Sequence, residues 1–142
     1  MSEQQTIERT WKAPIALVWE LWTTPDGLAS WWCPRGYQVD VHHLDLRVGG
    51  GFSYTMRPED GGAGGHRIDS TFTEVEAPRR LAYDSPFGDA VMTTAVTFSE
   101  QADGVRMVLE ISATKAGMLG GAMKGWASTL ERLEQLLAAR AA

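Results

Sequence analysis

The sequence of 142 residues contains a single cysteine, Cys33, and only 6 prolines. One cysteine excludes an intrachain disulfide framework and a zinc site built from several cysteines. A chain of this length buries enough surface to fold without such crosslinks. We therefore expect one domain over residues 1–142, in a reducing compartment.

Positive charge is scarce and scattered. The sequence has 13 lysines and arginines against 18 aspartates and glutamates, a net charge of −5. Only Arg79 and Arg80 are adjacent, so the clustered positive charge that nucleic-acid binding needs is missing. A run of about 18 apolar residues, the length of a membrane span, is also missing. The polar start of the chain lacks a secretion signal, so we expect a cytoplasmic protein without membrane insertion.

Large apolar side chains are plentiful by contrast. The sequence has 6 tryptophans and 6 methionines, and Trp31 and Trp32 are adjacent. Such bulky and adaptable side chains either fill a solid core or line a cavity. Composition leaves both interpretations open.

Hydrophobic periodicity predicts strands, two short helices and one long helix. Residues 13–23, with Pro14 at the start, and residues 25–32 are the expected short helices. Apolar residues at three- and four-residue spacing predict a final helix that begins between 118 and 124. Alternation with period two predicts strands over 5–12, 37–42, 52–57, 68–75, 81–85, 91–98 and 105–113.

The order of these elements predicts an α+β fold. Short turns such as Ala102-Asp103-Gly104 join successive strands, which indicates a mostly antiparallel sheet. The long helix carries the apolar stripe that must cover one face of the sheet. A curved sheet around one helix leaves a space between them that is often a ligand cavity.

Several segments resemble a known family. In the first quarter of the chain they are Ala13-Pro14, Val18-Trp19, Leu21-Trp22-Thr23, Pro25, Leu28, Trp31-Trp32 and Pro34. Further along they are Asp45-Leu46-Arg47-Val48-Gly49-Gly50 with Phe52, Phe72-Thr73-Glu74-Val75, Pro78, Arg80-Leu81, Val96-Thr97-Phe98, Asp103 to Met107, Gly125-Trp126, Leu130 and Leu133. In order and spacing they resemble the activator-of-Hsp-ninety-ATPase homologues, the AHSA-like proteins, nearly end to end.

This resemblance implies the helix-grip fold of the START/SRPBCC, or birch-pollen-allergen-like, superfamily. That fold has a curved antiparallel sheet of about six or seven strands around a long C-terminal helix, two short helices after the first strand, and an internal hydrophobic cavity. The superfamily includes lipid carriers, hormone receptors, cyclases, hydroxylase domains and co-chaperone domains. Fold alone therefore does not choose a function.

Our leading hypothesis is the binding of a small hydrophobic ligand, a lipid or an aromatic metabolite, in that cavity. A cofactor, a metal and catalysis are not required. Hydroxyl groups such as those of Tyr54 and Tyr83 offer polar handles, as does Ser70. The residues expected to line the cavity are Trp31, Trp32, Tyr54, Met56, Phe72, Tyr83, Met92, Thr94, Met107, Met118, Met123 and Trp126.

Two other functions stay open. A cyclase- or hydrolase-like enzyme would use Tyr54, Tyr83, Asp69 or Glu74 as acid or base, which requires such a group inside the cavity. A stress-related or co-chaperone interaction module would need a charged or apolar patch on the outer face of the sheet. The glycine-rich apolar residues 118–123 are a candidate gate for a pocket and also a candidate homodimer surface.

The remaining chemically active side chains indicate structural roles. His42 and His43 are neighbours on an expected strand and so point to opposite faces, and His66 is remote, which disfavours a metal site. Cys33 has no base nearby in the sequence and is expected to be an inert thiol. The glycines after Val48 lack the helix and the Lys-Ser/Thr pair of a phosphate-binding loop.

Overall fold

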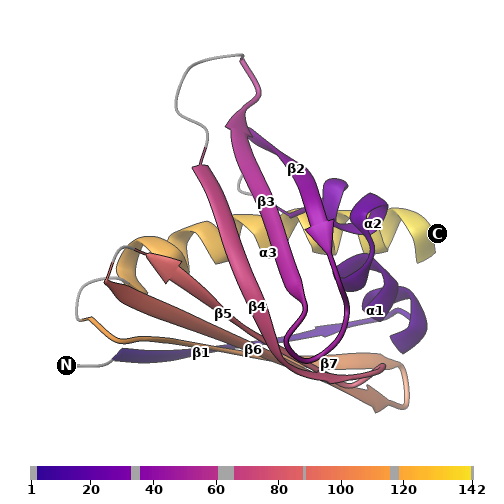
Figure 1. The fold of residues 1–142 in the computed structure, drawn as a ribbon. Helices are drawn as coiled ribbons and strands as arrows, with labels where there is room; N and C mark the ends of the chain where they lie inside the picture. Colours follow the sequence, from indigo (N-terminus) through magenta and orange to yellow (C-terminus); the bar gives the residue numbers. More distant parts are fainter. Residues whose placement is uncertain (1–2, 33–35, 61–65, 88, 116–118, 142) are drawn as a thin grey trace.

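The computed structural model describes residues 3–32, 36–60, 66–87, 89–115 and 119–141 (Figure 1). Among them are seven strands and three helices. The strands are β1 (Glu3–Trp11), β2 (Tyr37–Leu44), β3 (Gly51–Pro58), β4 (His66–Glu76), β5 (Arg80–Phe87), β6 (Ala90–Gln101) and β7 (Gly104–Ala113). The helices are α1 (Ile15–Thr23), α2 (Pro25–Ala29) and α3 (Leu119–Ala141).

All seven strands form one antiparallel sheet in the order β1-β7-β6-β5-β4-β3-β2. Each strand from β2 onward pairs with its neighbour in the chain, and β1 closes the order by pairing with β7. The sheet curls, and α3 runs across its concave side (Figure 1). The expected helix-grip architecture is confirmed, and so are the hairpin at 102–104 and the start of the long helix at Leu119.

Helix α3 connects the two edges of the curled sheet. At one edge, Arg9 of β1 pairs with Glu134, with 3.5 Å between Nε and Oε1. At the other edge, Arg132 donates a hydrogen bond of 3.3 Å from Nη1 to the carbonyl oxygen of Tyr37 in β2. The backbone of α3 lies nearest β1 and β7. The helix therefore covers one half of the concave face closely and leaves the half formed by β3 to β5 for side chains to fill.

The short helices are shorter than their patterns predict. Pro14 is extended, with ψ of 142°, and α1 begins only at Ile15. The segment predicted as a helix over 25–32 is helical only to Ala29, because the hydroxyl and the amide of Ser30 both bond to the carbonyl of Gly27. Trp31 and Trp32 thus follow the helix end rather than lie within the helix.

The prediction that His42 and His43 point to opposite faces of their strand is wrong. The pairing of β2 with β3 shifts between Val41 and His43, which is the mark of a β-bulge. The extra residue leaves both histidines exposed. The ring of His42 bonds through Nε2 to the hydroxyl of Thr55 at 2.7 Å.

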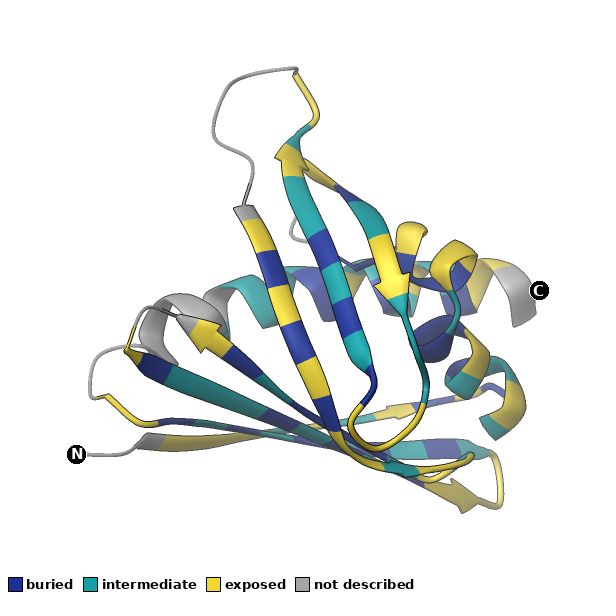
Figure 2. Cartoon of the chain, viewed as in Figure 1, coloured by how far each residue is buried: buried dark blue, intermediate teal, exposed yellow. Residues whose placement is uncertain are grey.

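Burial alternates along the strands, because successive side chains of a strand point to opposite faces of the sheet. Figure 2 shows this alternation on β4, where Ile68, Ser70 and Phe72 are buried and the residues between them are exposed. The strongest alternation in the sequence, along β7, is also borne out. Its buried residues are Val105, Met107, Leu109, Ile111 and Ala113.

We predict that replacing Gly104 by alanine destabilises the fold. Gly104 begins β7 with φ of +156°, and a Cβ there would lie 1.9 Å from the carbonyl oxygen of Trp11. Backbone atoms must move to relieve this clash, so we expect Gly104→Ala to lower the free energy of unfolding by about 3 kcal/mol. Glu100→Ala, an exposed change in the same hairpin, should stay within about 0.5 kcal/mol of the original protein. Urea denaturation of both variants measures the difference, and equal midpoints would contradict the prediction.

Candidate functional site

Trp32 lies at the centre of an aromatic cluster between α2, α3 and the sheet. Its ring is in contact with six others, with centroid separations from 5.1 to 6.4 Å. Every one of these rings is tilted by at least 56° from its plane. Edge-to-face contact of this kind is the favourable geometry for aromatic pairs. The six partners are Trp22, Trp31, Phe52, Tyr54, Tyr83 and Trp126.

Trp22 of α1 extends this cluster toward α3 and β6. Its ring stacks on that of Trp126 at 5.8 Å with 13° between the planes. It meets Trp31 at 4.7 Å and Phe98 of β6 at 5.6 Å. Trp22 is 2% exposed and Trp126 is half-buried. Trp126 is therefore the ring that connects the buried cluster with the surface.

Hydroxyl groups accompany the rings on the inner face of the sheet. The indole N–H of Trp32 donates to the hydroxyl oxygen of Tyr54. The hydroxyls of Tyr83 and Thr94, which are partners in the register of β5 and β6, are hydrogen-bonded to each other. The buried hydroxyls of Ser70 and Ser85 form a further pair at 2.6 Å on β4 and β5.

Burial keeps both phenols of this site protonated. Loss of solvation raises the pKa of Tyr54 to about 12, against a smaller opposing effect of the hydrogen bond from Trp32. Loss of solvation also raises the pKa of Tyr83 well above its ordinary value, and the neighbouring Tyr54 adds to this. At neutral pH both groups are uncharged hydrogen-bonding groups rather than bases.

Two buried donors in the described part of the chain have no acceptor. They are the indole N–H groups of Trp22 and Trp11. A buried donor without a partner costs about 1–3 kcal/mol. The neighbouring Trp31, by contrast, donates from Nε1 to the carbonyl of Leu21 at 2.9 Å. The orphaned N–H of Trp22 is thus a polar group inside the aromatic cluster that the described side chains leave unsatisfied.

The sequence-predicted residues fall into three groups. Trp31, Trp32, Tyr54, Phe72, Tyr83, Thr94 and Met107 are buried. Met56, Met92, Met123 and Trp126 are half-buried and pack against the core. Met118 lies outside the described residues, and so does Cys33. Sequence analysis missed Trp22, Phe52 and Phe98 as members of the cluster, although their helical or alternating spacing already placed each of them on an apolar face.

The carboxylates considered as catalytic acids or bases lie outside the aromatic cluster. Asp69 is exposed on β4 and pairs with Arg67 at 3.1 Å. Glu74 is exposed and pairs with Arg80. The buried polar residues of the described chain are Thr23, Ser70, Ser85, Thr94 and Thr129, none of them ionisable. Within the described ranges, no three His, Cys, Asp or Glu side chains gather as a metal site requires.

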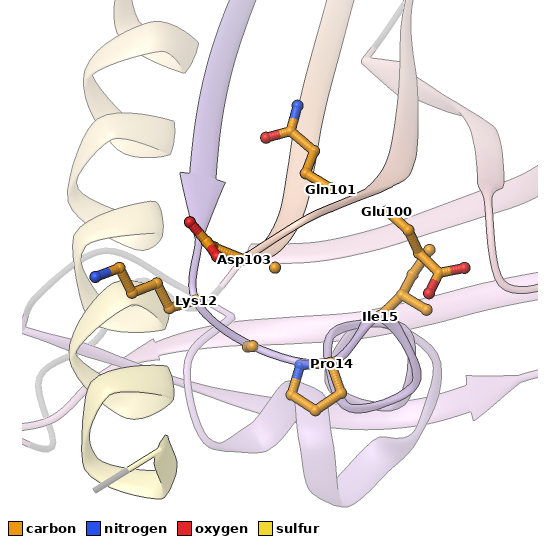
Figure 3. Close-up of a pocket in the computed structure, with 8 residues that line it drawn as sticks. Lys12, Pro14, Ile15, Glu100, Gln101 and Asp103 are labelled. Carbon is orange, nitrogen blue, oxygen red and sulfur yellow. The ribbon is translucent and has the colours of Figure 1, made fainter.

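Two hollows lined by described residues lie apart from the aromatic cluster. One is a groove of about 370 Å³ between the start of α1 and the hairpin of β6 and β7 (Figure 3). It is lined by Lys12, Ala13, Pro14, Ile15, Glu100, Gln101, Asp103 and Gly104. The other, of about 140 Å³, lies between Gln4, Arg80 and Glu110 over the outer residues of β6 and β7. Both hollows carry charges of both signs, unlike the interior.

Comparison with known proteins identifies relatives over nearly the whole chain. Residues 12–138 match the family described as Activator of Hsp90 ATPase homolog 1-like protein. The solution structure of the AHSA1-like protein from Aeromonas hydrophila is 28% identical, with a TM-score of 0.85 and coverage of 98% of this chain and 94% of that one. No protein with a curated description matches the sequence.

Two crystal structures are similar as well. A protein from Nitrosomonas europaea is 26% identical, with a TM-score of 0.84 over 96% of this chain and 95% of that one. A protein from Chromobacterium violaceum shares the fold at 24% identity, with a TM-score of 0.85 over 94% of this chain and 96% of that one. Among the described helices, none has the length and hydropathy needed to cross a membrane.

The raised pKa of Tyr54 predicts a loss of stability in alkali. The unfolded chain releases this proton near pH 10 and the folded chain only near 12, so folding stability falls as the pH rises between these values. One such group changes the free energy of unfolding by about 1.4 kcal/mol per pH unit. We expect the slope for Tyr54→Phe to be shallower by about that amount in urea denaturations at pH 9 to 12. Parallel slopes for the two proteins would show that Tyr54 ionises alike in both states.

Proposed function

This chain belongs to the family of activator of Hsp90 ATPase homolog 1-like proteins, and from that premise we propose that it binds a small, uncharged hydrophobic molecule between its sheet and α3. The observation that carries the proposal is the aromatic cluster around Trp32, together with the phenol groups of Tyr54 and Tyr83. Apolar walls with a few placed hydroxyls are the common composition of small-molecule sites.

The polar groups argue for a ligand more than the rings do. A core needs only apolar side chains, and each hydroxyl brought inside carries a cost unless it is bonded. Tyr54 accepts a bond from Trp32, and its hydroxyl also carries a proton that it can donate. Such an O–H group can orient a guest molecule that offers an acceptor atom.

We place the entrance at the beginning of α3. The first turns of this helix contain Gly120, Gly121 and Gly125, each of which weakens a helix by about 1 kcal/mol relative to alanine. The bonds from α3 to the two sheet edges come from Arg132 and Glu134, further along the helix. We infer that these glycine-rich turns separate from the sheet more readily than the later turns.

The two alternative functions have weaker support. An enzyme of the kind considered above would need a carboxylate or histidine inside the cluster, and Asp69 and Glu74 are exposed and paired. An interaction module would need an unpartnered patch on the outer face. There, Arg106 pairs with Glu8 and Arg80 pairs with Glu74, so much of the outer charge is already neutralised.

We expect the protein to retain a small hydrophobic molecule when it is purified from its own host. Native mass spectrometry should show one bound molecule per chain, and denaturing extraction should release it for identification. The same spectrum reports whether the homodimer considered in the sequence analysis forms. A clean unliganded mass, together with no thermal shift against a panel of lipids and neutral aromatic compounds, would count against the proposal.

Trp126 provides a directed test. Its half-buried ring stacks on Trp22 and meets Trp32 at 5.1 Å, so it lies between the cluster and the surface. We expect Trp126→Ala to weaken binding of the retained molecule at least tenfold in isothermal titration calorimetry. Trp19→Ala is the matched control, because Trp19 is also half-buried and contacts Phe98 from α1 without meeting Trp32. Equal weakening in both variants would indicate a general loss of packing instead.

A further inference from the structure

We infer that the ligand's seat is the position now filled by the ring of Trp32, and that the ligand is a neutral, planar, bicyclic aromatic molecule carrying a hydroxyl group. In this structure the ring of Trp32 fills the binding position, and the ligand displaces that ring when it binds. The inference rests on the proposed function and specifies both the binding site and the chemical class of the ligand.

The shape of the seat follows from the rings around Trp32. Six aromatic side chains from α1, from the segment after α2, and from α3, β3 and β5 surround it, and all are steeply tilted to its plane. Together they form a box around one flat bicyclic ring. A saturated chain of equal volume would lose these edge-to-face contacts, which stabilise aromatic pairs beyond the burial of apolar surface. The box therefore selects planar aromatic molecules over lipids.

Trp32 is held less firmly than its neighbour. Trp31 is fully buried and its N–H is bonded to the backbone carbonyl of Leu21. Trp32 is 5% exposed, and its indole N–H is bonded to a side chain, the hydroxyl of Tyr54, whereas its backbone N–H donates to the carbonyl of Leu28 at 2.8 Å. Its backbone follows the end of the five-residue helix α2. Rotation of Trp32 out of the box breaks one side-chain hydrogen bond and six ring contacts, which the ligand's ring replaces, and leaves the helices hydrogen-bonded.

The polar edge of the ligand follows from the donors and acceptors beside Trp32. An indole only donates, so Trp32 satisfies the hydroxyl oxygen of Tyr54 and offers no lone pair to the N–H of Trp22. That N–H is buried without an acceptor, although the two rings are 5.5 Å apart. A hydroxyl group donates and accepts, so a hydroxylated ring can serve Tyr54 and Trp22 in turn or together. This gain favours the ligand over the indole of Trp32.

The ligand must also be uncharged. No ionisable residue other than the two tyrosines is buried in the described part of the chain, and both phenols are protonated at neutral pH. A carboxylate or an ammonium group in the box would lose its hydration without gaining a counter-charge. The seat therefore excludes aromatic acids and amines of the same size.

Fluorine NMR tests the displacement directly. The full chain is labelled with 5-fluorotryptophan, and the signals are assigned with single Trp→Phe variants. Titration with 2-naphthol should move the Trp32 signal to the frequency of a solvent-exposed indole at one equivalent, with a much smaller change at Trp31. Saturable binding with the Trp32 signal unmoved would overturn the inference and leave the proposed function standing.

Calorimetry with a series of ligands tests the proposed ligand class. Because one hydrogen bond changes affinity by up to about tenfold, 2-naphthol should bind about tenfold more tightly than naphthalene, with indole between them. The anion 2-naphthoate should not bind. Equal affinity for 2-naphthol and naphthalene would refute the role of the hydroxyl. If none of the aromatic probes binds but a lipid from the earlier panel does, the inference fails and ligand binding remains.

The neighbouring tryptophans supply a matched pair of variants. Trp32→Phe puts a smaller ring in the binding position and removes the hydrogen bond from the indole to Tyr54. We therefore expect 2-naphthol to bind this variant about tenfold more tightly than the original protein. Trp31→Phe alters an adjacent buried indole that is bonded to the backbone, and it should not strengthen binding. The same response in both variants would place the ligand outside the Trp32 position. Circular dichroism of each variant confirms that it folds.

Discussion

One helix cannot cover a seven-stranded sheet, and much of this structure follows from that constraint. Seven strands about 4.8 Å apart span roughly 30 Å, whereas a helix with its side chains is about 10 Å wide. The sheet curls to bring its edges toward α3, and the backbone of α3 still lies nearest β1 and β7 only. The strands β3 to β5 need cover from elsewhere. Tryptophan and the other aromatic side chains, which are the largest available, provide it from α1, from the segment after α2 and from α3.

The fold was predictable because its signals are local. Alternation along β7 and the helical stripe of α3 require only neighbouring residues, and both were identified correctly from the sequence. The errors occurred where one extra hydrogen bond or one extra residue determines the local backbone structure. Ser30 ends α2 early by bonding to Gly27, and the bulge at Val41 and His43 turns both histidines outward. Neither event has a periodic signature in the sequence.

The candidate site was predictable in part. The adjacent tryptophans at 31 and 32 and the alternating Tyr54 and Tyr83 were correctly assigned to the interior. Their different environments were not predictable, since an acceptor 10 residues away, the carbonyl of Leu21, distinguishes Trp31 from Trp32. Trp22 was expected only on an apolar helix face. That it stacks on Trp126, more than 100 positions later, depends on how the two helices meet across the sheet.

The closely packed tryptophans also have an optical consequence. Trp22 and Trp126 stack at 5.8 Å, and Trp31 and Trp32 cross nearly at right angles at 5.2 Å. Indole transitions at such separations couple, and a fixed chiral arrangement of coupled chromophores produces strong near-ultraviolet circular dichroism. Loss of specific packing removes this signal while secondary structure persists. The near-ultraviolet circular dichroism of this protein therefore reports whether its tryptophan side chains are specifically packed.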